Sequence, residues 1–359
     1  MSGSGTRIIH LIPENGIGGV EVAARSMATQ PVLPCDFKLL FIAGERKSTD
    51  SARVIQPPFR SPRNPIAHLR ALLICLRYRP DVLIISLWKS VPVGLLVRLL
   101  RPRTRLVFFL HSETNLHVLD AWLSRAALGF ADEVWADSRA TLTGRLDPIK
   151  GKPTRVISFV TERLCPLADA APKPRPRFVI WARLSREKGI DLSLNFIYHL
   201  SQRGIDARFE VWGPDQGELS ALIQQAAELG IGNRVTFKGP ALREQLPELA
   251  TKASFLLQLS RTEGMGMAVV EAMQMGLVPV VTAVGEICRY VSDGDNGILV
   301  DPEHPRPALD NIDRLLVDPG EYRRIRENAL GTWQGVPLYA EEVCAAAAAT
   351  VEAPRHLSP

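Results

Sequence analysis

The sequence of 359 residues lacks any long hydrophobic run. A membrane-spanning helix needs about 18 or more uninterrupted apolar residues, and the apolar stretches 82–88 and 94–100 are too short or contain arginine. The first six residues are small and polar, without the basic and apolar regions of a signal peptide. We therefore expect a cytoplasmic protein that is either soluble or peripheral on the inner face of the membrane.

Cysteine is also scarce, and its positions show no pattern. The five cysteines are an odd number and lie far apart, with neither a Cys-x-x-Cys pair nor the spacing of metal ligands: Cys35, Cys75, Cys165, Cys288 and Cys344. This distribution predicts reduced thiols, mostly in the core. No metal site is indicated.

Acidic residues are under-represented in the first half of the chain. Residues 1–165 contain 23 Lys and Arg against 13 Asp and Glu, whereas the remainder contains 20 against 25. Much of the excess lies in the helix-like segments 60–79 and 98–105, whose other residues are largely apolar. Two interpretations stay open, a solvated helix face or a surface for anionic lipid or a phosphate-bearing acceptor. Nucleic acid is not expected, because no aromatic-interleaved strand pattern accompanies the charge.

Short β-branched or aromatic runs alternate with longer helix-like segments, which predicts parallel βαβ units. The first set of expected strands comprises 7–12, 38–43, 82–87, 105–110 and 133–136. The second set comprises 177–182, 207–212, 234–238, 254–259, 278–282 and 297–300. Between them, the proline-rich segment 166–176 is typical of a stiff linker.

This alternation predicts an α/β protein with two Rossmann-like domains, residues 1–168 and 177–335. A last helix near 338–353 could pack on either domain, including back on the first. Ligands of such sheets bind outside the carboxyl ends of the strands, so two facing domains would place their strand-end loops in one cleft. Candidate functional residues should therefore directly follow strands.

Two such candidates lie in the first half. Gly18 and Gly19 precede a helix that begins near Val20, where a phosphate or sugar could approach the backbone and the positive helix N-terminus. A glycine-rich turn that only reverses the chain is the alternative. His111 directly follows the strand 105–110 and could donate to a sugar hydroxyl, or could only cap the loop.

The second half contains four charged candidates. Arg183 and Lys188 follow the strand 177–182, and fixed cations there would stabilise the negative charge that develops on a departing diphosphate. Glu263 begins a glycine-containing loop with Gly264, Met265, Gly266 and Met267.

Glu271 follows eight positions after Glu263 in an apolar helical segment. A carboxylate in this position suits two ribose hydroxyls. The alternative is an exposed helical glutamate, but the surrounding residues are nearly all apolar or small.

Together these segments resemble glycosyltransferase family 4. The resemblance rests on the run 183–189, the pair Glu263 and Glu271, and the segments 275–280 and 293–300, in the order and spacing of that family. The N-terminal half is similar more loosely, through 18–21, His111 and 131–138.

The resemblance implies a GT-B fold, transfer from a nucleotide-sugar with retention of anomeric configuration, and neither a divalent metal nor another cofactor. It implies that Arg183 and Lys188 hold the diphosphate and that Glu271 binds the ribose. Glu263 and the backbone of 264–267 would meet the hydroxyls of the donor sugar. His111 would lie near the C6 side of that sugar, and Gly19 close to the phosphates.

Some positions depart from the family pattern. Met265 stands where an aromatic residue or leucine is usual, Trp181 and Ala182 replace the usual glycine before Arg183, and the stretch before Glu286 lacks one glycine. None of these changes removes a charge that the implied mechanism requires.

The expected acceptor is a lipid-linked or polysaccharide-precursor glycan, in cell-envelope polysaccharide or lipopolysaccharide biosynthesis, bound on the basic N-terminal domain. The expected partners are therefore a UDP- or GDP-sugar, this glycan, an anionic membrane surface, and no nucleic acid. The alternative is a catalytically silent subunit of the same fold that binds a sugar nucleotide.

Overall fold

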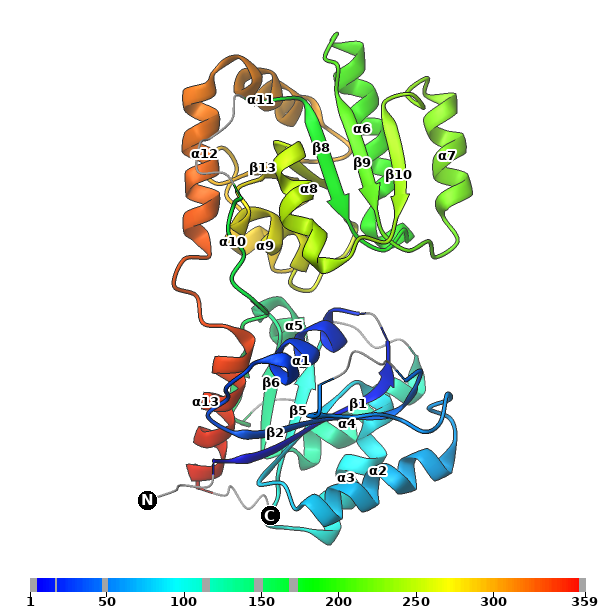
Figure 1. The fold of residues 1–359 in the computed structure, drawn as a ribbon, viewed down its shortest axis with the longest axis vertical. Helices are drawn as coiled ribbons and strands as arrows, with labels where there is room; N and C mark the ends of the chain where they lie inside the picture. The colour runs from blue at the N-terminus through cyan, green and yellow to red at the C-terminus, as the bar shows by residue number, and fades with distance from the viewer. Residues whose placement is uncertain are drawn as a thin grey trace. The chain divides into compact units, whose positions relative to one another are not determined.

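The chain folds into two compact units. The computed structural model describes residues 5–16, 18–46, 51–111, 117–144, 151–167 and 174–354. The first unit comprises 1–162 with 337–359, and the second comprises 163–336 (Figure 1). The division lies a few residues before the proline-rich segment, of which residues 168–173 are outside the described part.

The first unit is built on a parallel sheet of seven strands in the described residues, in the order β3-β2-β1-β4-β5-β6-β7. The strands are β1 (Arg7–Asn15), β2 (Asp36–Gly44), β3 (Val54–Ile55), β4 (Val82–Ser86), β5 (Arg105–Leu110), β6 (Glu133–Ala136) and β7 (Thr154–Val156). The central strands are buried along nearly their whole length, as expected for a sheet with helices on both faces.

The helices of the first unit form two groups. Helix α2 packs against α3 and α3 against α4, whereas α1 packs against α13. The bounds are α1 (Gly19–Thr29), α2 (Pro65–Tyr78), α3 (Val91–Leu100), α4 (Val118–Phe130), α5 (Arg139–Gly144) and α13 (Tyr339–Glu352). Helix α13, drawn in red in Figure 1, is the last helix of the chain and belongs to this first unit.

The second unit repeats the architecture with six described strands in the order β10-β9-β8-β11-β12-β13. These are β8 (Arg177–Trp181), β9 (Arg208–Trp212), β10 (Val235–Gly239), β11 (Phe255–Gln258), β12 (Val278–Val281) and β13 (Ile298–Leu299). Its helices are α6 (Ile190–Gln202), α7 (Leu219–Glu228), α8 (Leu246–Lys252), α9 (Met267–Gln274), α10 (Ile287–Tyr290), α11 (Arg306–Val317) and α12 (Pro319–Thr332). The eleven strands expected from the sequence are all present, and the α/β prediction of two Rossmann-like sheets is confirmed.

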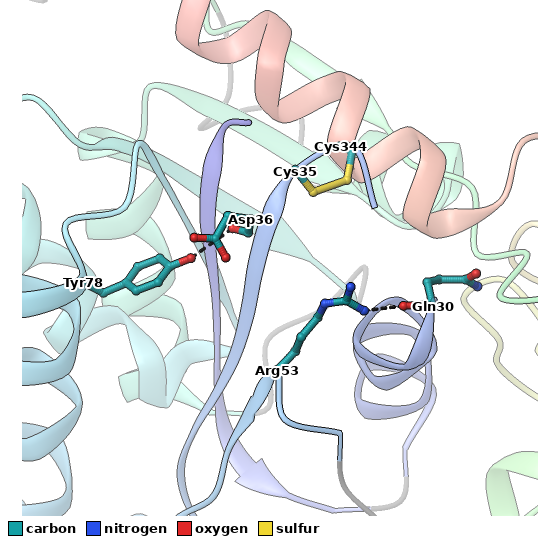
Figure 2. Close-up of a disulfide and its surroundings, with 6 residues drawn as sticks. All are labelled: Gln30, Cys35, Asp36, Arg53, Tyr78 and Cys344. Atoms are coloured by element: carbon teal, nitrogen blue, oxygen red, sulfur yellow. Dashed lines mark hydrogen bonds between the residues drawn. A yellow bond between two sulfur atoms is a disulfide. The ribbon is translucent and has the colours of Figure 1, made fainter. Parts of the chain in front are cut away.

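The cysteine prediction was wrong. Cys35, just before β2, and Cys344, in α13, form a disulfide across 309 positions of sequence (Figure 2). Of the three free cysteines, only Cys75 is buried, while Cys165 and Cys288 are exposed. The odd count and the wide spacing concealed the pair, because only the fold brings the last helix beside the start of β2.

Candidate active site

Four charged residues follow two neighbouring strands of the second sheet. Strand β8 pairs in parallel with β11, so the carboxyl ends of these strands lie at one edge of the sheet. Arg183 and Lys188 follow β8, and Glu263 and Glu271 follow β11. The positions inferred from the sequence therefore share one edge.

Lys188 and Glu263 are in direct contact. The Lys188 Nζ atom donates to Glu263 Oε1 over 2.7 Å, and the two side chains are 20% and 6% exposed. The turn Arg186–Lys188 ends at Gly189, whose φ of 61° is left-handed. A Cβ atom at Gly189 would lie 1.8 Å from the Leu259 carbonyl oxygen, so glycine lets this turn approach the end of β11.

Two polar residues missed in the sequence complete this contact. Gln258 Nε2 donates to Glu263 Oε1 over 2.6 Å, and Ser260 Oγ donates to the same oxygen over 2.8 Å. With Lys188, three donors converge on one carboxylate oxygen. The Glu263 carboxylate is thus held in a fixed position. The sequence signal that could have revealed its partners is a polar residue at the end of an apolar strand.

Glu271 is buried in α9 and bonded to two side chains of the same unit. Trp181 Nε1 donates to Glu271 Oε2 over 2.8 Å, and Arg243 donates to Glu271 Oε1 over 2.9 Å. The carboxylate is 8% exposed, which excludes the alternative of a solvated helical glutamate. Trp181, the departure from the family's usual glycine, is therefore a structural partner of Glu271.

Arg183 lies apart from these two carboxylates. Its side chain is exposed, and its guanidinium donates to Gln216 Oε1 at 3.5 Å, a long contact. The structure thus joins Lys188 to Glu263, gives Glu271 its own partners, and leaves Arg183 pointing into solvent. An exposed guanidinium beside a strand end is able to reorient toward an anion.

The loop between Glu263 and α9 is shaped by close backbone approaches. Gly266, at the start of α9, has a φ of 73°, and Tyr290 donates from its hydroxyl to the Met265 carbonyl over 2.8 Å. A Cβ atom at Gly285 would lie 1.9 Å from the Glu263 carbonyl oxygen. The Gly264 carbonyl also accepts from the Glu286 backbone over 2.9 Å. The loops 263–267 and 285–286 are thus fixed against each other.

The predicted glycine turn of the first unit leads into a helix with a carboxylate at its start. Gly18 is the N-terminal capping residue of α1, and Gly19 begins the helix. A Cβ atom at Gly18 would lie 2.5 Å from Glu21 Oε2, so the Glu21 side chain folds back over this turn. A carboxylate in the first helical turn is stabilised by the helix dipole, as a bound phosphate would be.

His111 follows β5, as expected, and its side chain is almost completely buried. Its imidazole is 4% exposed and contacts Ser86 and Asp137 of the neighbouring strand ends. The ring also lies against Phe109, with centroids 4.4 Å apart. This histidine is held by side-chain hydrogen bonding and packing.

In the part of the chain that the structure describes, no group of three or more His, Cys, Asp or Glu residues is arranged to hold a metal ion. Across the same described residues, no helix combines the length and apolar character needed to cross a membrane.

Two protein-family models match the chain. The model described as "Glycosyl transferase 4-like domain" matches residues 18–157, and the model described as "Glycosyl transferases group 1" matches residues 168–331.

Curated relatives match only part of the chain. An alpha-D-kanosaminyltransferase of Streptomyces kanamyceticus is 31% identical over 157 residues, which cover 43% of this chain and 40% of the relative. A GDP-mannose:cellobiosyl-diphosphopolyprenol alpha-mannosyltransferase of Xanthomonas oryzae is 29% identical over 148 residues, 41% of this chain and 39% of the relative. The match thus spans about two fifths of the length of these relatives.

Solved structures match the chain over nearly its whole length. The crystal structure of Anabaena Alr3699/HepE in complex with UDP-glucose has a TM-score of 0.76 at 21% identity, over 96% of this chain and 99% of that one. Sucrose-phosphate synthase of Thermosynechococcus elongatus has a TM-score of 0.76 at 20% identity, over 97% and 98% of the two chains. These similarities show the GT-B fold. The two matching models, which together extend over residues 18–157 and 168–331, and the motifs after β8 and β11 show that the chain belongs to glycosyltransferase family 4.

Proposed function

We propose that the chain is a retaining, metal-independent glycosyltransferase that uses a nucleotide-sugar donor. The observation that carries this proposal is the contact between Lys188 and Glu263 at the carboxyl ends of β8 and β11. It places a cation and a fixed carboxylate where ligands of parallel sheets bind.

The cations supply the electrostatic part of the reaction. As the bond between the sugar C1 and the diphosphate oxygen breaks, negative charge grows on the leaving group, and Lys188 and Arg183 stabilise it. Two protein cations perform the task that a divalent metal performs in other transferases. Lys188 is partly buried, so its charge is less screened by solvent than that of an exposed lysine.

Glu263 binds the donor sugar and does not act as a nucleophile in this proposal. Its Oε1 atom already accepts hydrogen bonds from Lys188, Gln258 and Ser260, which hold the carboxylate in a fixed position. The carboxylate is then suited to accept a hydrogen bond from a sugar hydroxyl. The acceptor hydroxyl forms its bond to C1 on the face that the diphosphate leaves, and its proton passes to the departing phosphate oxygen, so configuration is retained.

Glu271 binds the ribose of the donor. Hydroxyl groups of the ribose donate to the carboxylate beside, or in place of, the guanidinium of Arg243. A buried carboxylate with charge-assisted partners is rigid, which favours recognition of a fixed pair of hydroxyls. The donor nucleoside is uridine or guanosine in this proposal, in line with the UDP-glucose complex of HepE and the GDP-mannose transferase among the relatives.

A thermal-shift screen against UDP-, GDP- and dTDP-sugars tests the donor. Ligand at 100 times its dissociation constant adds about 2.7 kcal/mol to the free energy of unfolding. We expect a rise with one of these nucleotide-sugars for the wild type, and a much smaller rise for Lys188→Met. The matched control is Arg186→Met, because Arg186 is an exposed cation of the same turn. An equal rise in Lys188→Met and wild type would contradict the diphosphate assignment.

A coupled assay for released UDP or GDP then separates the enzyme from the silent-subunit alternative. Release that depends on an added glycan acceptor supports the enzyme. Binding of a nucleotide-sugar without release, across lipid-linked and soluble acceptors, supports the silent subunit.

We also propose that the acceptor is lipid-linked or a polysaccharide precursor of the cell envelope, and that the first unit binds an anionic membrane surface. Exposed apolar side chains gather on three helices that pack side by side. We call them the α2–α4 apolar face: Ile66, Leu69, Leu73, Leu96, Leu99, Leu100, Val118, Leu119, Trp122 and Phe130. So many exposed apolar side chains on neighbouring helices are unusual for a surface that contacts only water.

Arginines accompany this face, although not all of them are available. Arg77 is exposed and lies four positions after Leu73, on the same stripe of α2. Arg70 is half-buried and donates to the Gln56 carbonyl over 3.2 Å. Arg98 pairs with Asp132 at 3.1 Å. The charge for lipid headgroups therefore comes from exposed positions such as Arg77 and Arg125.

A further inference from the structure

A small cavity lies at the edge of the second sheet opposite to the candidate active site. Its lining includes Ala253, which precedes β11, and Gly276, which precedes β12, so the cavity is at the amino ends of these strands. Its volume is about 130 Å³. Most of its walls are apolar, and the polar side chains that line it are Thr251, Tyr322 and Arg326. All the lining residues belong to the second unit.

Arg326, in α12, brings a buried positive charge to this cavity. The residue is 7% exposed, and its Nε atom donates to the Gly276 carbonyl oxygen over 3.0 Å. Gly276 has a φ of 77°, and a Cβ atom there would lie 2.7 Å from Arg326 Nη2. Glycine therefore leaves the space that the guanidinium occupies. The guanidinium is held against the turn between α9 and β12.

This charge has no counter-ion in the part of the chain that the structure describes. Within those residues, the bond to Gly276 is the one hydrogen bond that the guanidinium makes, and no carboxylate forms an ion pair with it. A buried charge without a partner lowers the free energy of unfolding, and buried polar groups without partners often have a functional reason. An anion in the cavity would supply the partner of Arg326.

The hydrogen-bonding groups of the cavity favour a carboxylate over a phosphate. The Thr251 hydroxyl donates to the Glu248 carbonyl over 2.7 Å, and the Tyr322 hydroxyl donates to the Ser254 carbonyl over 3.2 Å. Among the lining side chains, Arg326 is therefore the donor that a ligand can use. A guanidinium binds a carboxylate through two parallel N–H···O bonds, whereas a phosphate group has three strong acceptor oxygens and up to two charges that need further donors.

The size and the walls of the cavity define the rest of the ligand. A cavity of roughly 150 Å³ holds benzene, and butyrate has as many non-hydrogen atoms as benzene. Pro166, Leu167, Pro247, Ala250 and Met275 form apolar walls for a short hydrocarbon chain. Each methylene group that is buried against such walls strengthens binding by about fourfold.

We propose that this cavity binds a small carboxylate with a short apolar chain, which pairs with the guanidinium of Arg326. The carboxylate oxygens accept from Nη1 and Nη2, and the chain contacts the apolar walls. The site lies within the second unit alone. It is independent of the donor and of the acceptor in the proposed function, so its failure and theirs are distinguishable.

Nuclear magnetic resonance of arginine side chains tests the site, with butyrate as the probe. In the full-length chain labelled with ¹⁵N at arginine, ¹H–¹⁵N correlations show the Nε–H groups, and the Arg326 signal is identified by its loss in Arg326→Met. Sodium butyrate, at an ionic strength held constant with sodium chloride, should shift this signal to saturation. Acetate, which has two methylene groups fewer, should bind about 15-fold more weakly.

Three results of this titration overturn the proposal. The first is an Arg326 signal that does not shift in a saturable way, which would make the arginine a purely structural cation at the end of α9. The second is equal affinity for acetate and butyrate, because the apolar walls would then bind no chain. The third is tighter binding of inorganic phosphate than of butyrate, because the ligand class would then be wrong.

Unfolding experiments compare Arg326 with another cation of the same helix. Arg326→Met removes the charge and keeps an aliphatic side chain, and Arg323→Met is the matched control, because Arg323 is an exposed arginine of α12. Butyrate at ten times its dissociation constant should raise the folding equilibrium constant roughly tenfold, relative to sodium chloride at the same concentration. We expect this rise in the wild type and in Arg323→Met, but not in Arg326→Met.

An equal rise in all three proteins overturns the proposal, because butyrate would then act on the surface in general. If Arg326→Met does not fold, Arg326→Lys takes its place. The lysine keeps the positive charge but cannot form two parallel bonds to a carboxylate. Butyrate should then bind at least about tenfold more weakly than to the wild type, the typical effect of one lost hydrogen bond to a charged group, and unchanged affinity overturns the pairing with Arg326.

Discussion

Removal of the Lys188 charge tests the proposed site at its centre. Lys188→Met keeps the length of the aliphatic stem but deletes the ammonium that lies 2.7 Å from Glu263 Oε1. Loss of a preorganised charge at a leaving-group site raises the barrier by about 2.7 to 4 kcal/mol, so we expect kcat to fall at least about 100-fold. Steady-state release of UDP or GDP, measured with saturating donor, gives this value.

The same substitution also affects folding, and the two effects are separable. Glu263 is 6% exposed, but it keeps its bonds from Gln258 and Ser260 when Lys188 is removed. The loss of folding free energy should therefore be about 1 to 3 kcal/mol, less than for a fully orphaned buried charge. Urea unfolding measures this loss of folding free energy. The turnover of wild type and Lys188→Met is then recorded under conditions in which both proteins are folded.

A double-mutant cycle shows whether Lys188 acts on the diphosphate or only through Glu263. If it acts on the leaving group, Lys188→Met lowers kcat also in the Glu263→Gln background. If it only orients Glu263, the second substitution adds nothing. If Lys188→Met lowers kcat by less than threefold, the reasoning is refuted, because the diphosphate must then bind elsewhere.

Four other predictions follow from the described contacts. Turnover should persist in excess chelator, and a strict requirement for Mg²⁺ would contradict the proposed mechanism. Arg77→Glu with Leu73→Asp should abolish co-sedimentation with anionic liposomes at low salt, because each basic residue near such a surface contributes about 1 kcal/mol; unchanged binding would exclude the α2–α4 apolar face. Cys344→Ser should lower the free energy of unfolding of the oxidised protein by about 2 to 4 kcal/mol in urea titrations, and no change would mean that the bridge is not formed in solution. Burial lowers the pKa of His10 from 6.5 to about 3, so the unfolded chain binds more protons than the folded chain between these pH values. The contribution of the neutral His10 ring to the free energy of unfolding is therefore present above pH 6.5 and should fall by about 2 kcal/mol from pH 6.5 to 5. A free energy of unfolding that does not change over this range would show that His10 is not buried as a neutral ring.

The sheets could be predicted from sequence because their strands are buried on both faces. Segments such as 82–86 and 105–110 are almost wholly apolar or β-branched, a pattern that parallel strands require. The strands Val54–Ile55 and Thr154–Val156 were missed, because two or three residues are too few for any periodicity to appear.

The candidate site was predictable only in part. The positions of Lys188 and Glu263 follow from strand ends and from motif spacing. The partners of Glu271 do not, because Arg243 comes from a separate, strongly charged turn, and nothing in its local sequence distinguishes it from a solvated arginine. His10 could have been noticed as a histidine inside an apolar strand, although its contact with Ser86 spans 76 positions and depends on the order of the strands.

The assignment of α13 to the first unit has a consequence for biosynthesis. The ribosome synthesises the chain from the N-terminus to the C-terminus. The whole second unit, 163–336, is therefore made before the helix that completes the first unit. At about 5 to 20 residues per second, this interval lasts on the order of ten seconds or more. During it, the partners of Tyr339 and Cys344 in the nascent sheet are uncovered, and the second unit is free to fold before the first is complete.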